Sequence, residues 1–86
     1  MIRVLLFAQL REQLGRPVFE IAFAPDESIT ALIQRLIADN GEDWQVLSLA
    51  DTHVALNQVE LDAAEFSDRI LSDGDEVAFF PPVTGG

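Results

Sequence analysis

Residues 28–41 read SITALIQRLIADNG and contain the clearest helical pattern in the chain. Ser28 is a favourable N-cap residue, and Gly41 stands where a left-handed residue commonly ends a helix. Between them, aliphatic side chains recur at the spacing of one helix face, at Ile29, Leu32, Ile33, Leu36 and Ile37. We therefore predict a helix from about Ile29 to Asn40, whose apolar face must cover a sheet.

Strand patterns lie on both sides of this helix. Alternating or nearly continuous apolar residues occur at 2–7, 18–23, 54–56, 59–61 and 76–80. Strands before and after one helical crossover fit an α+β roll of the β-grasp type, in which the first and last strands lie side by side. The sequence thus predicts a mixed sheet of four to five strands with one main helix packed across one face.

The connecting segments carry weaker patterns. Residues 9–14 favour a short helix that stops at the following glycine, and 43–50 are expected to form a second, shorter helix. This second helix would carry Trp44, which we assign to structure. The stretch 62–73 has no clear period and receives no element, whereas 73–75 is a tight turn before the last strand.

Two prolines mark the end of the folded domain. Pro81 and Pro82 have no N–H groups, so a strand that reaches Phe80 cannot continue its ladder of hydrogen bonds. We therefore divide the chain into a β-grasp domain at 1–80 and a flexible C-terminal tail at 81–86, which ends in two glycines.

The composition narrows the classes of function. The chain has 86 residues, enough for one hydrophobic core, and no run approaches the ~20 apolar residues of a membrane span. No secretory signal opens it, so we expect a cytoplasmic domain. Fifteen Asp and Glu against five Arg give a formal net charge of −10, which disfavours nucleic acid and favours a basic protein partner. A solvated, solubilising surface explains the same carboxylates.

Side chains for catalysis and metal binding are scarce. Cysteine is absent, and His53 is the one histidine, so no transition-metal site is expected and His53 is assigned to structure. No catalytic constellation and no glycine-rich phosphate loop occurs. Lysine is also absent, so the N-terminus is the one amine able to attack an activated carboxyl group. If the protein takes part in chemistry, we expect it to act as a substrate or carrier.

The last two residues, Gly85 and Gly86, are the candidate for that chemistry. Residues 81–86 would span about 20 Å if extended, enough to enter a neighbouring protein's active site. Glycines lack side chains and can pass through a narrow channel. A carboxylate is a poor electrophile until it is converted to a mixed anhydride, a step that requires ATP, and a partner must supply the ATP site. A frayed end without function is the alternative.

An apolar patch is expected near the root of this tail. If Val77 and Phe79 face the helix, then Ala78 and Phe80 point away from it, and the same argument places Phe7 on the outer side of the first strand. With the first and last strands adjacent, Phe7 and Phe80 would form an exposed patch, typical of a protein interface. The alternative is that loops fold over the rings.

Two segments resemble a known family closely. The end, DGDEVAFFPPVTGG at 73–86, and the start, VLLFAQLREQLG at 4–15, are similar to the MoaD family of ubiquitin-like sulfur carriers, the small subunits of molybdopterin synthase, within the MoaD/ThiS superfamily. The helix at 28–41 and ALNQ at 55–58 also resemble that family. The match is weakest at 42–52 and 62–69, where lengths vary.

The resemblance implies a reaction cycle. A MoeB-type E1-like enzyme would adenylate Gly86 with ATP and magnesium, and a sulfur donor protein would convert it to a thiocarboxylate. A MoaE-type large subunit would accept the tail and use the sulfur to build the molybdopterin dithiolene from precursor Z. This chain would be a non-catalytic subunit of a heterotetramer that binds no cofactor itself. Its partner-binding residues would be Phe7, Phe80, Pro81, Pro82, Val83 and Thr84.

Two alternatives stay open. Related carriers for thiamine synthesis or tRNA thiolation also end in two glycines, usually without the preceding FFPPVT. A binding module that uses the Phe7 and Phe80 face without carrying sulfur is a function of another class.

Overall fold

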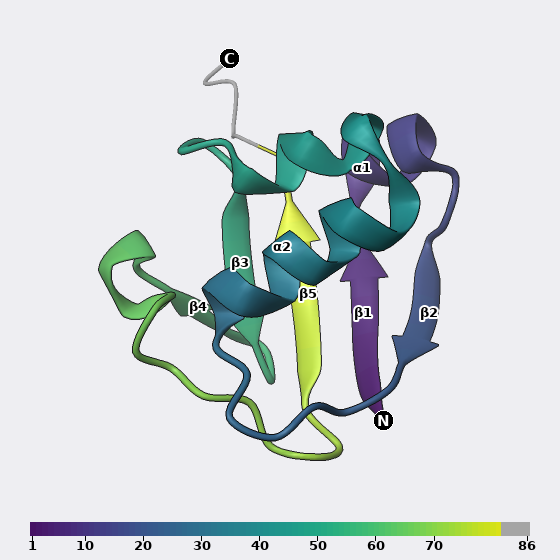
Figure 1. Ribbon diagram of the computed structural model, residues 1–86. Coiled ribbons are helices and arrows are strands. Elements are labelled where there is room, and N and C mark those ends of the chain that lie inside the picture. The colour runs from purple at the N-terminus through teal and green to yellow at the C-terminus, as the bar shows by residue number, and fades with distance from the viewer. Residues whose placement is uncertain (82–86) are drawn as a thin grey trace.

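The computed structural model describes residues 1–81 and has a five-stranded sheet covered by a helix (Figure 1). In chain order the elements are β1 (Ile2–Leu6), α1 (Ala8–Leu14), β2 (Val18–Ile21), α2 (Ile29–Asn40), η1 (Glu42–Ser48), β3 (His53–Leu56), β4 (Val59–Leu61), η2 (Ala63–Glu65) and β5 (Glu76–Phe80). The elements η1 and η2 are 3₁₀ helices.

The sheet is mixed, with the strand order β2-β1-β5-β3-β4. The first and last strands, β1 and β5, pair in parallel, and the other neighbours are antiparallel. Helix α2 crosses one face of this sheet, as Figure 1 shows. The predicted architecture of a mixed sheet and one main helix is therefore confirmed.

Helix α2 begins and ends at the predicted residues. The Ser28 hydroxyl accepts a hydrogen bond from the Ala31 N–H at 3.1 Å, which is the N-cap contact expected. At the other end, the Gly41 N–H donates to the Ile37 carbonyl oxygen. Gly41 has φ +106° and ψ 179°, so the predicted positive φ is present, but its ψ is extended instead of left-handed helical.

The core lies between α2 and the sheet. Its fully buried members come from alternate positions of β1, β3 and β5, from one face of α2, and from α1 and η1: Ile2, Val4, Leu6, Leu10, Ile29, Leu32, Leu36, Leu47, Val54, Val77 and Phe79. Element η1 closes one end with Trp44, which is 5% exposed and packs edge-on against Phe19 at 5.6 Å between ring centroids. The structural assignment of Trp44 is confirmed, although its helix is of the 3₁₀ type.

The segment without a predicted element is held by tertiary contacts. Asp62 and Glu65 form a capping box around η2. Further on, the Leu71 N–H donates to the Glu27 carbonyl oxygen at 2.8 Å, and Ile70 forms a bridge with Ser28. This segment therefore packs beside the start of α2.

A partly buried ion pair fixes the loop before α2. The Glu27 carboxylate is 8% exposed and accepts hydrogen bonds from Arg35 at 3.0 and 2.8 Å. Arg35 also donates to the Ala22 carbonyl oxygen at 2.8 Å. One guanidinium thus ties the helix to the residues on both sides of the preceding turn. None of the helices within residues 1–81 has the length and hydrophobicity required to span a membrane.

Candidate functional site

The candidate site lies on the side of the sheet opposite α2, which we call the outer face. Successive side chains of a strand point to opposite sides, and Leu6, Val77 and Phe79 are buried against the helix. Phe7 and Phe80 are therefore placed on the outer face at the end where β5 leaves the sheet. Both side chains are partly exposed, at 36%.

Phe7 and Phe80, here called the aromatic pair, are stacked. Their ring centroids are 4.6 Å apart and the planes differ by 6°. The Phe7 N–H donates to the Phe79 carbonyl oxygen at 3.1 Å, which fixes the first ring beside the last strand. The parallel pairing of β1 and β5 thus brings together two residues that are 73 positions apart in the sequence. The exposed patch predicted from the strand pattern is present.

A row of smaller side chains crosses the sheet next to the aromatic pair. Leu5, Ala78 and Ala55 stand in register on β1, β5 and β3. Ala78 lies on the outer face as predicted, yet it is only 5% exposed. A methyl group on a central strand is screened by longer side chains on the same face. The exposed apolar surface of the outer face therefore consists of the aromatic pair and of Val18 on β2, which is in register with Leu5 and is 49% exposed.

Charged groups occupy the other end of the outer face. Arg3 on β1 is in register with Glu20 on β2 and with Glu76 on β5. Along β1 and β5, the outer face is therefore apolar where the tail begins and charged near the N-terminus.

A polar pair borders the aromatic pair on β3 and β4. His53 Nδ1 lies 2.8 Å from Glu60 Oε2, and His53 is in register with Phe80. Together with Phe80 and Pro81, these two residues line a pocket of about 220 Å³, which we call the His53 pocket. Sequence reasoning assigned His53 to structure and did not consider Glu60. The register of the β3-β4 hairpin, with Ala55 opposite Glu60, makes His53 and Glu60 diagonal neighbours, and this signal was available in the sequence.

The predicted tail lies almost entirely outside the described residues. Pro81 is half-buried and forms one wall of the His53 pocket. The other predicted site residues, Pro82, Val83, Thr84, Gly85 and Gly86, fall outside the part of the chain that the structure describes. Their assignments stay predictions.

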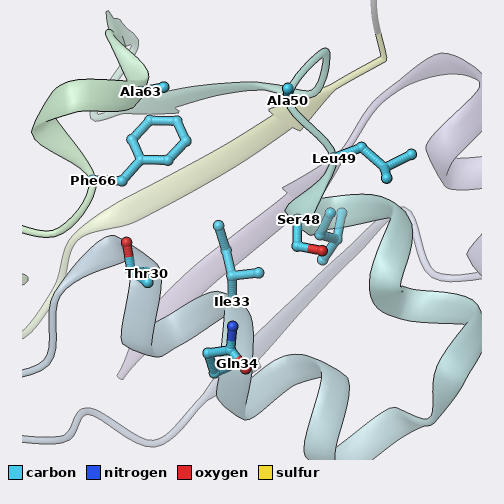
Figure 2. A pocket seen from close by; sticks show the side chains of 9 residues that line it. Thr30, Ile33, Gln34, Ser48, Leu49, Ala50, Ala63 and Phe66 are labelled. Carbon is cyan, nitrogen blue, oxygen red and sulfur yellow. The ribbon is translucent and has the colours of Figure 1, made fainter.

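A second pocket lies on the helix side of the sheet (Figure 2). Its volume is about 230 Å³, and its residues come from α2, η1, the segment after η1, and the segment around η2: Thr30, Ile33, Gln34, Leu47, Ser48, Leu49, Ala50, Ala63 and Phe66. Figure 2 shows Phe66 and Ile33 directed toward the space between these elements. The pocket was missed because it forms between segments with weak sequence patterns.

Nothing in the described region has the make-up of a metal site. No group of three or more His, Asp or Glu side chains gathers within residues 1–81. The outer face near the end of β5 presents stacked aromatic rings, a carboxylate and an imidazole.

This sheet order with a single covering helix defines the ubiquitin-like β-grasp class. The crystal structure of SAMP1 from Haloferax volcanii is similar over 99% of this chain and 98% of that chain, with a TM-score of 0.77 and 22% identity. The chain belongs to the ThiS family, whose model matches residues 4–86.

Within that family, a curated relative is similar over its whole length. The molybdopterin synthase sulfur carrier subunit of Escherichia coli K12 is 46% identical, and the comparison covers 100% of both chains. A chain in the complex of subunits 1 and 2 of the molybdopterin-converting factor from Helicobacter pylori is also similar in fold. It has a TM-score of 0.64 and 22% identity over 99% of this chain and 97% of that chain.

Proposed function

We propose that this chain is the sulfur carrier subunit of a molybdopterin synthase. The observation that carries the proposal is the full-length similarity to the E. coli subunit of that name, at 46% identity. The expected MoaD-type ending, FFPPVTGG at 79–86, agrees with it. The protein would supply sulfur to the reaction and would have no active site of its own.

The proposed sulfur-bearing group is the carboxylate of Gly86. An activating enzyme of the MoeB type would join it to AMP, using ATP with magnesium and releasing pyrophosphate. A sulfur donor protein would then displace AMP and leave a thiocarboxylate. Two such transfers, each delivering one sulfur from a loaded chain to precursor Z in the large subunit, would build the dithiolene, and with water each transfer would return the carboxylate of Gly86.

The described residues would contribute docking. The aromatic pair offers ring surface that is partly exposed in the free chain and loses contact with water when a partner covers it. Because β5 ends at Phe80, a partner seated on these rings would lie at the root of residues 81–86. The net charge of −10 would favour a partner that is basic on the contacting side.

The expected partner in synthesis is a MoaE-type large subunit. Support comes from the H. pylori complex, in which the similar chain is solved together with a second subunit of the converting factor. A heterotetramer of two large and two small subunits, in the cytoplasm, is the assembly we propose.

A reconstituted synthase reaction tests the function. Full-length and Gly86-deleted chains would each be loaded with activating enzyme and sulfur donor, then mixed with the large subunit and precursor Z. We expect molybdopterin from the full-length chain only, with equal binding of both chains to the large subunit. Equal product from both chains would contradict the proposal. If the full-length chain were loaded with sulfur but did not bind the large subunit, the result would favour a carrier for thiamine synthesis or tRNA thiolation instead.

A further inference from the structure

The His53 pocket lies beside the proposed interface and is not explained by sulfur transfer. Its walls are an imidazole, a carboxylate, an aromatic ring and the first proline of the tail. Resting on the proposed function, we propose that this pocket receives an arginine side chain of the large synthase subunit.

The carboxylate of Glu60 has one oxygen in contact with His53 and one oxygen open to a partner. Its Oε2 pairs with His53 Nδ1 at 2.8 Å, whereas Oε1 has no hydrogen-bond donor among residues 1–81. The Glu60 side chain is 65% exposed and that of His53 43%. A cation from another protein can therefore reach the open oxygen of a carboxylate that one contact already restrains, which lowers the entropy cost of the new contact.

The geometry favours a guanidinium over other cations. Arginine is planar and donates two parallel hydrogen bonds to a carboxylate, and its flat face stacks on aromatic rings. Glu60 and Phe80 line the same pocket, so one guanidinium can contact both. The volume of about 220 Å³ admits the end of a long side chain and lies below the ~300 to 1,000 Å³ of typical small-molecule sites.

Position and charge point to a protein that takes up the tail. Pro81 forms a wall of the pocket, so a partner that receives the residues after it passes over Glu60. The nearest cationic strand residue on the outer face is Arg3, which is in register with Glu20 and Glu76 at the opposite end of β1. Arg3 therefore does not neutralise Glu60, and a partner can supply the positive charge. We assign the arginine to the large subunit because the similar H. pylori chain forms a complex with such a subunit.

Calorimetric titration of the full chain into its cognate large subunit tests the assignment. For Glu60→Gln we expect the dissociation constant to rise about tenfold, since a charge-assisted hydrogen bond is lost. The association rate should also depend less steeply on salt. Glu42→Gln, an exposed glutamate at the start of η1 on the helix side, removes the same charge and should bind within twofold of the unchanged chain.

His53 is assigned as a positioning residue for that carboxylate. In the chain that keeps Glu60, His53→Ala should weaken binding. In the Glu60→Gln chain it should have little further effect, because both changes disrupt the same contact. His53→Gln, which keeps a donor, should restore part of the affinity. A purely structural role for His53 would instead give additive losses.

A double-mutant cycle identifies the partner group. Substituting each arginine of the large subunit in turn, we expect one position at which Glu60→Gln no longer has an effect. The assignment fails if Glu60→Gln binds within twofold of the unchanged chain, if no arginine couples to it, or if only the activating enzyme loses affinity. These results are separable from failure of the proposed function, in which the unchanged chain itself acquires no sulfur.

Discussion

At the residue scale, the stacked rings of Phe7 and Phe80 carry the docking argument. Each is 36% exposed, and their centroids lie 4.6 Å apart. Truncating a buried aromatic anchor in an interface typically costs ~2 kcal/mol or more. We expect Phe80→Ala, and separately Phe7→Ala, to weaken binding to the large subunit by more than about 1 kcal/mol, measured by calorimetry.

Leu49→Ala is the matched control for the aromatic pair. Leu49 is 58% exposed and lines the helix-side pocket, so its loss should leave the affinity unchanged. If both phenylalanine variants bind as tightly as the unchanged chain, the outer face is not the interface.

The ion pair between Glu27 and Arg35 is a second residue-scale test. Arg35→Ala leaves a carboxylate that is 8% exposed without its two hydrogen bonds. We expect the free energy of unfolding in urea to fall by about 2 kcal/mol. Arg69→Ala breaks a surface pair with Glu65, both about half-exposed, and should cost less than ~0.5 kcal/mol. If both variants lost the same free energy of unfolding, the pair between Glu27 and Arg35 would contribute no more stability than a surface pair.

At the scale of elements, the N-cap of α2 offers a direct measurement. The Ser28 hydroxyl accepts from the Ala31 N–H, so Ser28→Ala should lower the free energy of unfolding by about 1 kcal/mol. Ser67→Ala, at an exposed position after η2, should change it by less than ~0.5 kcal/mol. If Ser28→Ala left the free energy of unfolding unchanged, the start of α2 would be fixed by tertiary contacts such as the bridge between Ser28 and Ile70.

Elements fixed by local pattern were predictable, and those fixed by distant contacts were not. Helix α2 has its cap, its period and its terminating glycine within 28–41, and both ends match the prediction. The stretch 62–73 is ordered by backbone hydrogen bonds with Glu27, Ile29 and Thr30, far away in the sequence, so no periodic signal marked it. For the same reason the helix-side pocket, which these segments build, was not foreseen.

One part of the candidate site was predictable from the sequence and another part was not. Phe7 and Phe80 could be placed together because alternation in β1 and β5 and the expected parallel pairing were enough. The turn at Asn57 and Gln58 sets the register of β3 with β4, but the His53 pocket also needed the register of β3 with β5, which no local turn fixes. Both turn residues have positive φ, the backbone of a tight hairpin, although neither is glycine. The burial of Ala78 could not be inferred from alternation, because it depends on the size of neighbouring side chains.

At the scale of the whole molecule, the absence of lysine bears on an activated C-terminus. The N-terminal amine of Met1 is paired with Asp73, and because β1 and β5 are parallel it lies at the end of the sheet opposite Phe80. We expect that incubation with activating enzyme and ATP, without a sulfur donor, yields no amide-linked dimers of the chain. Denaturing electrophoresis with mass spectrometry checks this, with Gln13→Lys, an exposed position on α1, as the variant that supplies an acceptor. Dimers of the unchanged chain linked through Met1 would contradict the expectation.

The most direct test of the account is the intact mass of the chain after incubation with activating enzyme, ATP, magnesium and a sulfur donor. An activating enzyme that loads a related carrier in parallel serves as the positive control, and the Gly86-deleted chain as the negative one. We predict that the mass rises by the difference between one sulfur and one oxygen atom, with the change located on Gly86. An unchanged mass beside a loaded control, or a modification located elsewhere in the chain, would contradict the account.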